Sequence, residues 1–307
     1  MLPASPLPAT PLPGHPLPAT PLSPTSEPPR PAFLAHHFDT PRQQLEASKL
    51  GMWLFLTTEV LFFSGLFCAY VVFRSSRPEV FYWSHFFLDT RLGAVNTCVL
   101  LVSSCSAAYA VRAAQLGQRR SLMAAIVVTL LCALLFLGIK GAEYSAKFDE
   151  GLLPGARFRP TEQVWRKPAF ARLHPEAAAY AEAVFSRAQS GDAAQPGAEV
   201  KPRGAAATKE MLEPLLRAGV IGRAAEYSDL PSRPQNAHVF FSIYFLMTGL
   251  HGFHVLGGVA VWSWLLLRAA RGEFGPSYFG PIDVAALYWH LVDLIWIYLF
   301  PLLYLIH

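Results

Sequence analysis

Five long apolar stretches constrain this chain more than any other feature of its sequence. They run over residues 51–73, 92–111, 121–139, 237–267 and 284–307. Each has about the 20 residues that a helix needs to cross a bilayer. In lipid, every backbone N–H and C=O must be satisfied within its own segment, so these stretches are predicted to be helices. The sequence therefore predicts an all-α membrane protein with five transmembrane helices.

The composition agrees with a lipid environment and excludes several functions. Of the 307 residues, 53% are hydrophobic and 15% charged, whereas a soluble domain carries about 25% charged residues. The net charge of +4 is spread over many loops, and no basic run or basic-aromatic platform predicts a nucleic-acid partner. The cysteines lie within apolar stretches and form no CxxC pair, which predicts buried, inert thiols: Cys68, Cys98, Cys105 and Cys132.

The spans fall into two groups, each preceded by a polar segment. Residues 1–46 form a proline-rich segment in which the string PLPAT occurs twice, and this composition predicts a disordered tail. Residues 47–151 hold the first three spans, and residues 236–307 hold the last two. Between them lies a long extramembrane insert, residues 152–235.

The insert shows signals for two helices. One is predicted over 175–189, because a proline stands at its start and a glycine follows its end. Thr208 is predicted to cap a second, shorter helix that Gly219 closes. Large apolar residues are sparse here, so a packed domain is not expected.

Basic residues in the short loops predict the orientation of the spans. With the N-terminus inside, the cytoplasmic segments carry eight basic residues: Arg30, Arg42, Lys49, Arg112, Arg119, Arg120, Arg268 and Arg271. The short external loop carries three: Arg74, Arg77 and Arg91. This bias predicts a cytoplasmic N-terminus, with the insert and the C-terminus on the outer side.

Two acids lie inside predicted spans, and each needs an explanation. An acid at mid-membrane costs about 2.5–3.5 kcal/mol on insertion scales, and Glu59 and Asp293 stand in such places. Each is either a protonatable group on a proton or ion route or a carboxyl that fixes the packing of a neighbouring helix. For Glu59 both interpretations stay open. For Asp293 packing is favoured, because His290 lies three residues earlier on the same helix face and offers a partner.

The fourth span carries two histidines three residues apart, His251 and His254. Their spacing puts them on one helix face and raises the question of a metal site, since histidine is the commonest metal ligand. Haem or copper needs further ligands, and only His238 and His290 lie near membrane depth. We therefore predict hydrogen-bonding histidines, with His251 or His254 as the partner of Glu59. No metal or cofactor site is predicted in this chain.

Aromatic and basic residues near the ends of spans commonly anchor a helix at the membrane surface. The candidates for lipid-facing or anchoring positions are Trp53, Arg74, Trp289 and Arg268.

The spans also resemble a known family in both motifs and order. The first begins KLGMWLFL at 49–56 and continues to Glu59. The second has NT at 96–97 and SS at 103–104, and the third ends with EY at 143–144 and Gly151. The fourth has YF at 244–245, TGLHGFHV at 248–255 and Gly258, and the fifth has YWHLVD at 288–293, Trp296 and Phe300. These strings resemble subunit III of haem–copper oxidases (cytochrome c oxidases), in a five-span form that lacks the first two of seven spans.

Two local features depart from that resemblance. The insert at 152–235 does not match the core pattern, so nothing carries over to it. Asp283 stands where the family more often has glutamate.

The resemblance implies a subunit without redox centres that packs on subunit I. It implies that haem and copper belong to the partner subunits I and II, and that the spans form two bundles separated by a lipid-filled cleft with bound phospholipid. Such a subunit supports stability and proton uptake during oxygen reduction. Glu59 corresponds to the family's carbodiimide-reactive glutamate. The implied location is the bacterial cytoplasmic (inner) membrane, with the periplasmic insert free to meet cytochrome c or another respiratory complex.

Three alternatives remain at this point. The same fold serves as subunit III of a quinol oxidase or as an accessory subunit of a nitric oxide reductase, and the sequence holds no donor site to separate them. A secondary transporter would use Glu59 and Asp293 as coupling acids. Transporters usually show internal repeats or broken helices, and the sequence offers neither a convincing repeat nor a paired interruption.

Overall fold

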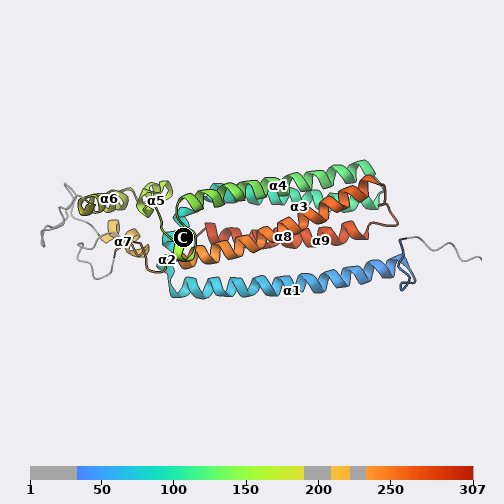
Figure 1. Ribbon diagram of the computed structural model, residues 1–307, viewed down its shortest axis with the longest axis horizontal. Coiled ribbons are helices and arrows are strands. Elements are labelled where there is room, and N and C mark those ends of the chain that lie inside the picture. The colour runs from blue at the N-terminus through green and yellow to red at the C-terminus, as the bar shows by residue number, and fades with distance from the viewer. Residues whose placement is uncertain (1–32, 190–208, 222–232, 307) are drawn as a thin grey trace, which may run out of the picture.

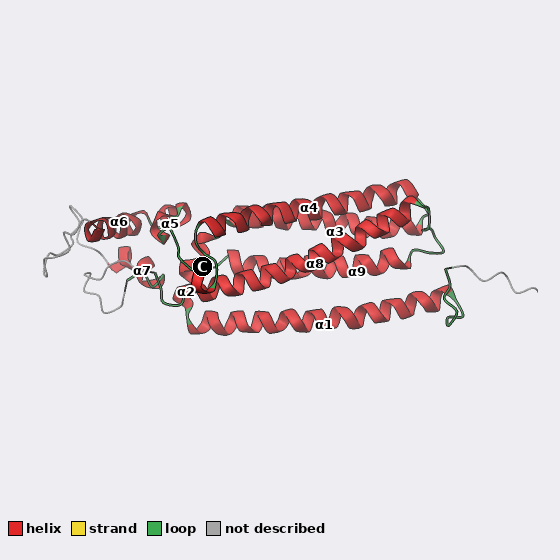
Figure 2. Cartoon of the chain, in the orientation of Figure 1, coloured by secondary structure: helices red, strands yellow, loops and turns green. Residues whose placement is uncertain are grey.

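A computed structural model describes residues 33–189, 209–221 and 233–306. Within these ranges the regular structure is helical, apart from one isolated bridge between Gly275 and Tyr278 (Figure 2). Five helices are long and apolar enough to cross a membrane: α1 (Pro41–Ser76), α3 (Thr90–Gln115), α4 (Arg119–Asp149), α8 (His238–Ala270) and α9 (Gly280–Tyr304). The predicted all-α fold with five spans is confirmed.

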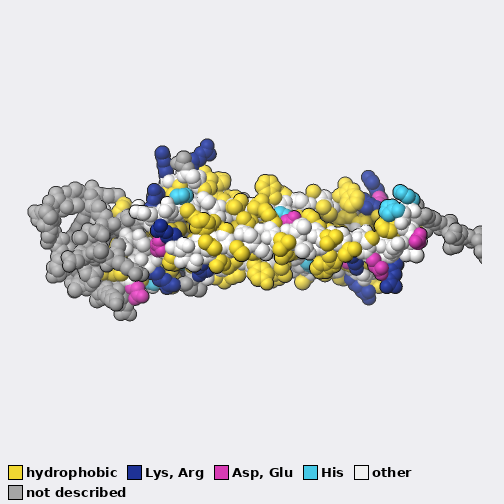
Figure 3. Space-filling model, turned by 90° about the horizontal axis from the view of Figure 1, so that it is seen from below, with side chains coloured by type: hydrophobic (Ala, Val, Ile, Leu, Met, Phe, Trp, Pro, Cys, Tyr) yellow, Lys and Arg dark blue, Asp and Glu magenta, His cyan; other side chains and the backbone are white. Residues whose placement is uncertain are grey.

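Four of these helices form a bundle, and the fifth lies beside it. Helices α3, α4, α8 and α9 pack together, while α1 runs along one side against α8 and α9 (Figure 1). The family resemblance implies two bundles. The described residues form one bundle of four helices, and α1 lies beside it as a single helix. Hydrophobic side chains cover the middle of the molecule, and charged ones gather towards its two ends (Figure 3).

The ends of the long helices follow local rules. The Thr40 side chain accepts a hydrogen bond from the Gln43 amide, and Pro41 occupies the first turn of α1. Asp89 caps α3 in the same way. Gly117, at a φ of 69°, turns the chain from α3 into α4, a backbone conformation that glycine adopts without steric cost. Short-range signals therefore set where these spans begin and turn.

Several helices extend beyond the apolar stretches that predicted them. The third apolar stretch ends at residue 139, but α4 continues to Asp149 and buries Lys140, Glu143 and Lys147. The bundle covers these charged side chains, so they belong to its interior.

The insert lies beyond one end of the bundle and is better packed than its composition suggested. Its described part contains α5 (Pro168–Leu173), α6 (Pro175–Gln189) and α7 (Lys209–Arg217). The helix predicted at 175–189 is confirmed. Thr208 lies outside the described residues, so its predicted cap is not tested, and Gly219 follows α7 at a φ of 62°.

The large apolar residues of the insert, although few, are buried. Its buried side chains include Leu152, Val164, Trp165, Phe170, Tyr180, Val184, Leu212, Leu215 and Val220. They pack partly against one another and partly against α2 (Pro78–Ser84), a short helix after α1 whose residues Val80–Ser84 are buried. A few well-placed large residues are enough because the end of the bundle supplies the other side of the core.

His174, a histidine at the contact between the insert and α2, is expected to make the docking of the insert sensitive to pH. Tyr82 on α2 and His174 between α5 and α6 are joined by a hydrogen bond of 3.1 Å between the phenol oxygen and Nε2. Burial lowers the pKa of His174 below its usual 6.5, and the nearby positive charge of Arg217 lowers it further. The folded protein therefore favours the neutral form of the His174 ring.

Acid is expected to loosen the insert before it affects the bundle. Because the folded pKa of His174 lies below the unfolded value, its stabilisation is complete above pH 6.5 and is lost as the pH falls through the folded value. The protection of α5 and α6 against hydrogen exchange, measured relative to the intrinsic exchange rate at each pH, should fall on acidification while that of α8 does not. His174→Gln should reduce this acid sensitivity of the insert. His37→Gln, before the start of α1 and far from the insert, should leave it unchanged. Equal acid sensitivity in both variants would contradict the assignment.

Candidate functional site: polar groups inside the helix bundle

The first buried polar contact joins α1 to the bundle. Glu59 Oε2 on α1 lies 2.9 Å from His254 Nε2 on α8, and both side chains are largely shielded from solvent. The other ring nitrogen of His254 lies 2.8 Å from the backbone oxygen of Leu250. Tyr288 on α9 donates to the backbone oxygen of His254 at 2.8 Å. The predicted partnership between Glu59 and a histidine of the fourth span is found, with His254 as the partner.

This geometry sets the number of protons that the pair holds. The Leu250 carbonyl can only accept, so His254 Nδ1 must carry a hydrogen. Nε2 then either accepts from a protonated Glu59 or, in a cationic ring, donates to a Glu59 carboxylate. In both cases one proton lies between the two side chains, and the pair as a whole is neutral. A neutral pair is the form that lipid tolerates best.

His251 has different surroundings from His254, although the two are three residues apart. It is fully buried between the rings of Phe136 and Trp296, with ring centroids 5.6 and 5.4 Å away. Neither of its nitrogens has a hydrogen-bond partner in the described part of the chain. The prediction of a hydrogen-bonding histidine is therefore wrong for His251, which lies between α4 and α9, whereas His254 contacts α1.

Asp293 and His290 do not satisfy each other as predicted. His290 Nδ1 instead lies 2.6 Å from Ser104 Oγ on α3. Asp293 is only 3% exposed, and its carboxyl oxygens lack a hydrogen-bond partner among the described residues. The partner of His290 came from another helix, which intrahelical spacing does not reveal.

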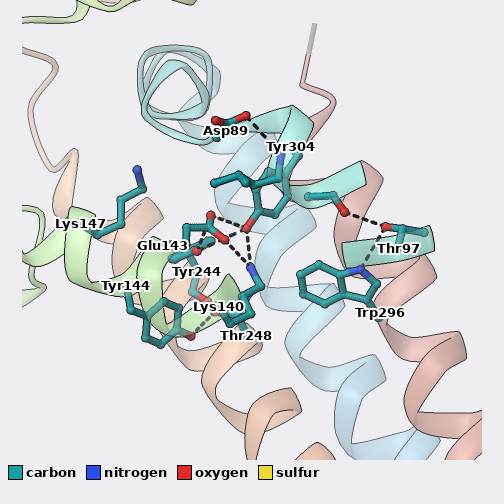
Figure 4. Close-up of polar contacts among 12 residues, drawn as sticks. Asp89, Thr97, Lys140, Glu143, Tyr144, Lys147, Tyr244, Thr248, Trp296 and Tyr304 are labelled. Atoms are coloured by element: carbon teal, nitrogen blue, oxygen red, sulfur yellow. Dashed lines mark hydrogen bonds and ion pairs between the residues drawn. The ribbon is translucent and has the colours of Figure 1, made fainter. Parts of the chain in front are cut away.

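The most extensive polar network was not predicted from the sequence. Lys140 Nζ on α4 donates to Glu143 Oε2 at 2.8 Å and to the hydroxyl of Tyr304 at 2.6 Å. Tyr304 on α9 and Tyr244 on α8 both donate to Glu143 Oε1, at 2.6 and 2.9 Å (Figure 4). Lys140 also lies 4.5 Å from the centre of a Trp296 ring. The carboxylate thus accepts three hydrogen bonds, and one charged pair connects three helices of the bundle.

The signal for this network was the spacing of Lys140 and Glu143, three residues apart on one helix. It was missed because the third apolar stretch ends at residue 139, and Glu143 was used only as a family motif at the end of that span. The tyrosine partners lie 101 and more residues away in sequence, so only the fold brings them there.

The four lipid-facing candidates have different environments. Trp53 is 57% exposed on α1, as expected of an anchor, and Arg74 lines a cavity at the other end of that helix. Trp289 is fully buried and donates to Ser103 Oγ at 3.0 Å, so its assignment to the lipid-facing surface was wrong. Arg268 is held by Glu273 at 2.5 Å and packs on the ring of Trp264.

The buried state predicted for the cysteines is also corrected. Cys68, Cys98 and Cys105 are exposed on the surface of the isolated chain, and Cys132 is partly buried. Among the described residues, no group of three or more His, Cys, Asp or Glu side chains is placed to hold a metal ion.

The fold and these contacts define a class: a multi-pass helical membrane protein whose buried polar side chains mostly bond to neighbouring helices. The family model for cytochrome c oxidase subunit III matches residues 31–149 and 211–307. The chain therefore belongs to the cytochrome c oxidase subunit III family. The match omits residues 150–210, which hold most of the insert.

Individual relatives agree with this family. A probable cytochrome c oxidase subunit 3 of Mycobacterium tuberculosis is 38% identical over 89 residues, which cover 28% of this chain and 44% of the relative. The corresponding protein of Nocardia farcinica is 34% identical over the same length, with the same coverage. Cytochrome c oxidase subunit 3 of Gallus gallus is 24% identical over 280 residues, 89% of this chain and 73% of the relative. The chain thus spans less than half the length of the bacterial relatives that it matches.

Replacing Lys140 alone is expected to lower the free energy of unfolding more than replacing Lys140 and Glu143 together. Lys140→Met leaves the Glu143 carboxylate buried without its cation and should lower the free energy of unfolding by about 3–5 kcal/mol. The double variant Lys140→Met/Glu143→Leu should recover most of that loss. Denaturation of the full-length chain in detergent measures both. Arg42→Met, which breaks the exposed Arg42–Glu46 pair, is the control and should cost less than about 1 kcal/mol. Equal costs for the two single variants would contradict this account.

Proposed function

We propose that the chain is subunit III of a proton-pumping terminal oxidase, a cytochrome c oxidase of aerobic respiration. In this role it carries no active site, packs on subunit I and supports the stability and proton uptake of the complex. Family membership over both groups of spans carries the proposal. The haem and copper centres belong to the partner subunits I and II.

The surface of α1 supports packing against another subunit or lipid. Its large apolar side chains are widely exposed along its length, among them Leu50, Leu54, Leu61 and Val72. A groove of about 320 Å³ lies between α1 and α9 and is lined by apolar residues that include Trp53, Val60 and Leu291. Its shape and lining suit phospholipid acyl chains, as a lipid-binding subunit requires.

The relatives are named as cytochrome c oxidase subunits, which favours cytochrome c as the electron donor of the complex. No observation favours a quinol oxidase or a nitric oxide reductase. A transporter that couples transport to Glu59 and Asp293 has no support either, because Glu59 is engaged by His254.

Glu59 is proposed to be a carboxyl that shares its proton with His254 and is not an obligatory relay. It lies near the middle of α1, the helix beside the four-helix bundle. A protonated carboxyl is the form that carbodiimides modify, so the shared proton agrees with the family's reactive glutamate. His251, His290 and Asp293 are proposed to be structural.

The proposed location is the bacterial cytoplasmic (inner) membrane, with the N-terminus in the cytoplasm and the insert and C-terminus in the periplasm. The charge bias of the short loops supports this orientation. The insert packs on the end of the bundle and there offers a surface to subunit II, cytochrome c or another respiratory complex.

Glu59→Gln tests the supporting role. Glutamine can donate to His254 as the protonated acid does, so the complex should assemble, keep its haem spectrum and reduce oxygen at nearly the normal rate. Carbodiimide labelling of this chain should disappear. Glu59→Ala leaves His254 unpaired at a cost of about 1–3 kcal/mol and should weaken retention of the subunit. Glu46→Gln, an exposed site on the same helix, is the control. Loss of turnover in an intact Glu59→Gln complex would replace this proposal with a direct proton role.

Cysteine labelling tests the orientation. In a chain whose native cysteines are replaced by serine, Glu176→Cys on the exposed face of α6 should react with an impermeant maleimide in intact spheroplasts. Arg120→Cys, at the other end of the bundle, should react only after lysis. The reverse pattern would show that the insert faces the cytoplasm.

A further inference from the structure

A cavity of about 300 Å³ lies at the end of the bundle opposite the insert (Figure 1). One wall is the segment before α1 together with the first turns of that helix. The other wall is the loop between α8 and α9 together with the start of α9. The lining residues on which the argument depends are Phe33, Gln44, Tyr278 and Phe279. No residue of the Glu59 or Lys140 contacts takes part, so this cavity is separate from the polar groups of the bundle.

Aromatic rings form much of the cavity wall. The ring of Phe33 stacks on that of Tyr278 with centroids 4.8 Å apart, and Tyr278 stacks in turn on Phe274 at 5.8 Å. The Tyr278 hydroxyl accepts a hydrogen bond from Arg268 at 3.3 Å, and a phenol can donate its own hydrogen at the same time. Grooves lined by aromatic rings bind proline-rich segments in the polyproline II conformation. The backbone carbonyls of such a segment make no internal hydrogen bonds and are free to accept from a phenol.

The proline-rich segment joins the described chain at this wall. Nε2 of Gln44 donates to the backbone oxygen of Phe33 at 3.2 Å, and Oε1 of Gln44 accepts from the Ala35 amide at 2.8 Å. These two bonds hold the backbone of residues 33–35 against α1, and with it the point from which residues 1–32 lead away. Residues 1–32 lie outside the described part of the chain, so the sequence has to identify which of them could occupy the cavity.

Prolines recur at a spacing of three within residues 1–32, and Pro18, Pro21 and Pro24 form the longest such run. Polyproline II has three residues per turn, so this spacing places the three rings along one face. The connecting residues 25–32 reach at most about 30 Å when extended. Because Phe33 itself lines the cavity, the run can return to it. A short tether also gives an effective concentration of about millimolar, so a weak contact is sufficient.

We propose that the run Pro18–Pro24 binds in this cavity in the polyproline II conformation, with its proline rings on Phe33, Tyr278 and Phe279. A backbone carbonyl of the run accepts a hydrogen bond from the Tyr278 hydroxyl. The bound run joins the start of α1 to the loop between α8 and α9, and so attaches α1 to the bundle at this end. The proposal does not depend on the oxidase function.

The distance between two spin labels on the full-length chain in detergent tests this docking. In a chain whose native cysteines are replaced by serine, the labels are attached at Ser23→Cys within the run and at Arg120→Cys at the start of α4. A docked run should give one narrow distance distribution. Tyr278→Ala should lower the ratio of docked to free run about tenfold, because it removes a ring on which a proline packs. Tyr298→Ala is the matched control, since Tyr298 is an exposed tyrosine of α9 that does not line the cavity, and it should leave the distribution unchanged.

Changing the three prolines of the run to serine tests the occupant and alters no described residue, so it leaves the bundle itself unchanged. This triple variant should broaden the distribution as Tyr278→Ala does. Changing Pro3, Pro6 and Pro8 to serine, outside the run, should not.

A broad distribution in the unsubstituted chain, or a narrow one that survives either the triple change or Tyr278→Ala, would overturn the proposal. Two further results would overturn it by identifying another occupant. A narrow distribution between chains that carry one label each would show that the run binds to a second copy. Broadening when phospholipid is added to the delipidated chain would show that lipid occupies the cavity.

Discussion

A polar side chain within a membrane is costly unless it finds a partner inside the protein, and most of the contacts that meet this need connect different helices of the five. The clearest case is the Glu143 carboxylate, which accepts hydrogen bonds from one lysine and two tyrosines on three helices. Elsewhere the same need is met in pairs, such as His290 with Ser104 and Trp289 with Ser103. These hydrogen bonds are directional, so they fix the rotation of each helix about its own axis. Apolar packing alone specifies that rotation less strictly.

The helix α1 shows how loosely a span can be held when such contacts are few. Its polar attachments include the Glu59–His254 bond near its middle, the Lys49–Asp283 ion pair of 2.7 Å near its start and the hydrogen bond from the Tyr70 hydroxyl to the Leu302 backbone oxygen near its end. The rest of its surface is largely apolar and exposed. A helix with this surface is suited to lie between its own bundle and lipid or another subunit. The shared proton of Glu59 and His254 then has a structural purpose, because it attaches α1 without placing a net charge in lipid.

The candidate site could be predicted in part. Glu59 stood out because an acid in an apolar stretch is costly, and a histidine of the fourth span was its expected partner. The choice of His254 over His251 depended on the rotation of α8, which the sequence does not reveal. Lys140 and Glu143 were overlooked because hydropathy marks where apolar residues stop, whereas the helix continues as long as its hydrogen bonds do. The packing of the insert was underestimated because its core includes α2 and the end of the bundle, which lie elsewhere in the sequence.

The sequence by itself determined the class of the protein, the number of its spans and its family. Each of these depends on local runs of residues: a segment of about 20 apolar residues in lipid has to be a helix whatever its neighbours are. The tertiary structure alone decided which polar groups meet, since the partners of Glu143 and His290 lie on other helices. It also decided that Trp289 is buried and that Phe33 and Tyr278 line one cavity. The physical reason is that helix formation is a short-range process, whereas the partner of a side chain depends on the rotation and tilt of helices far apart in the chain.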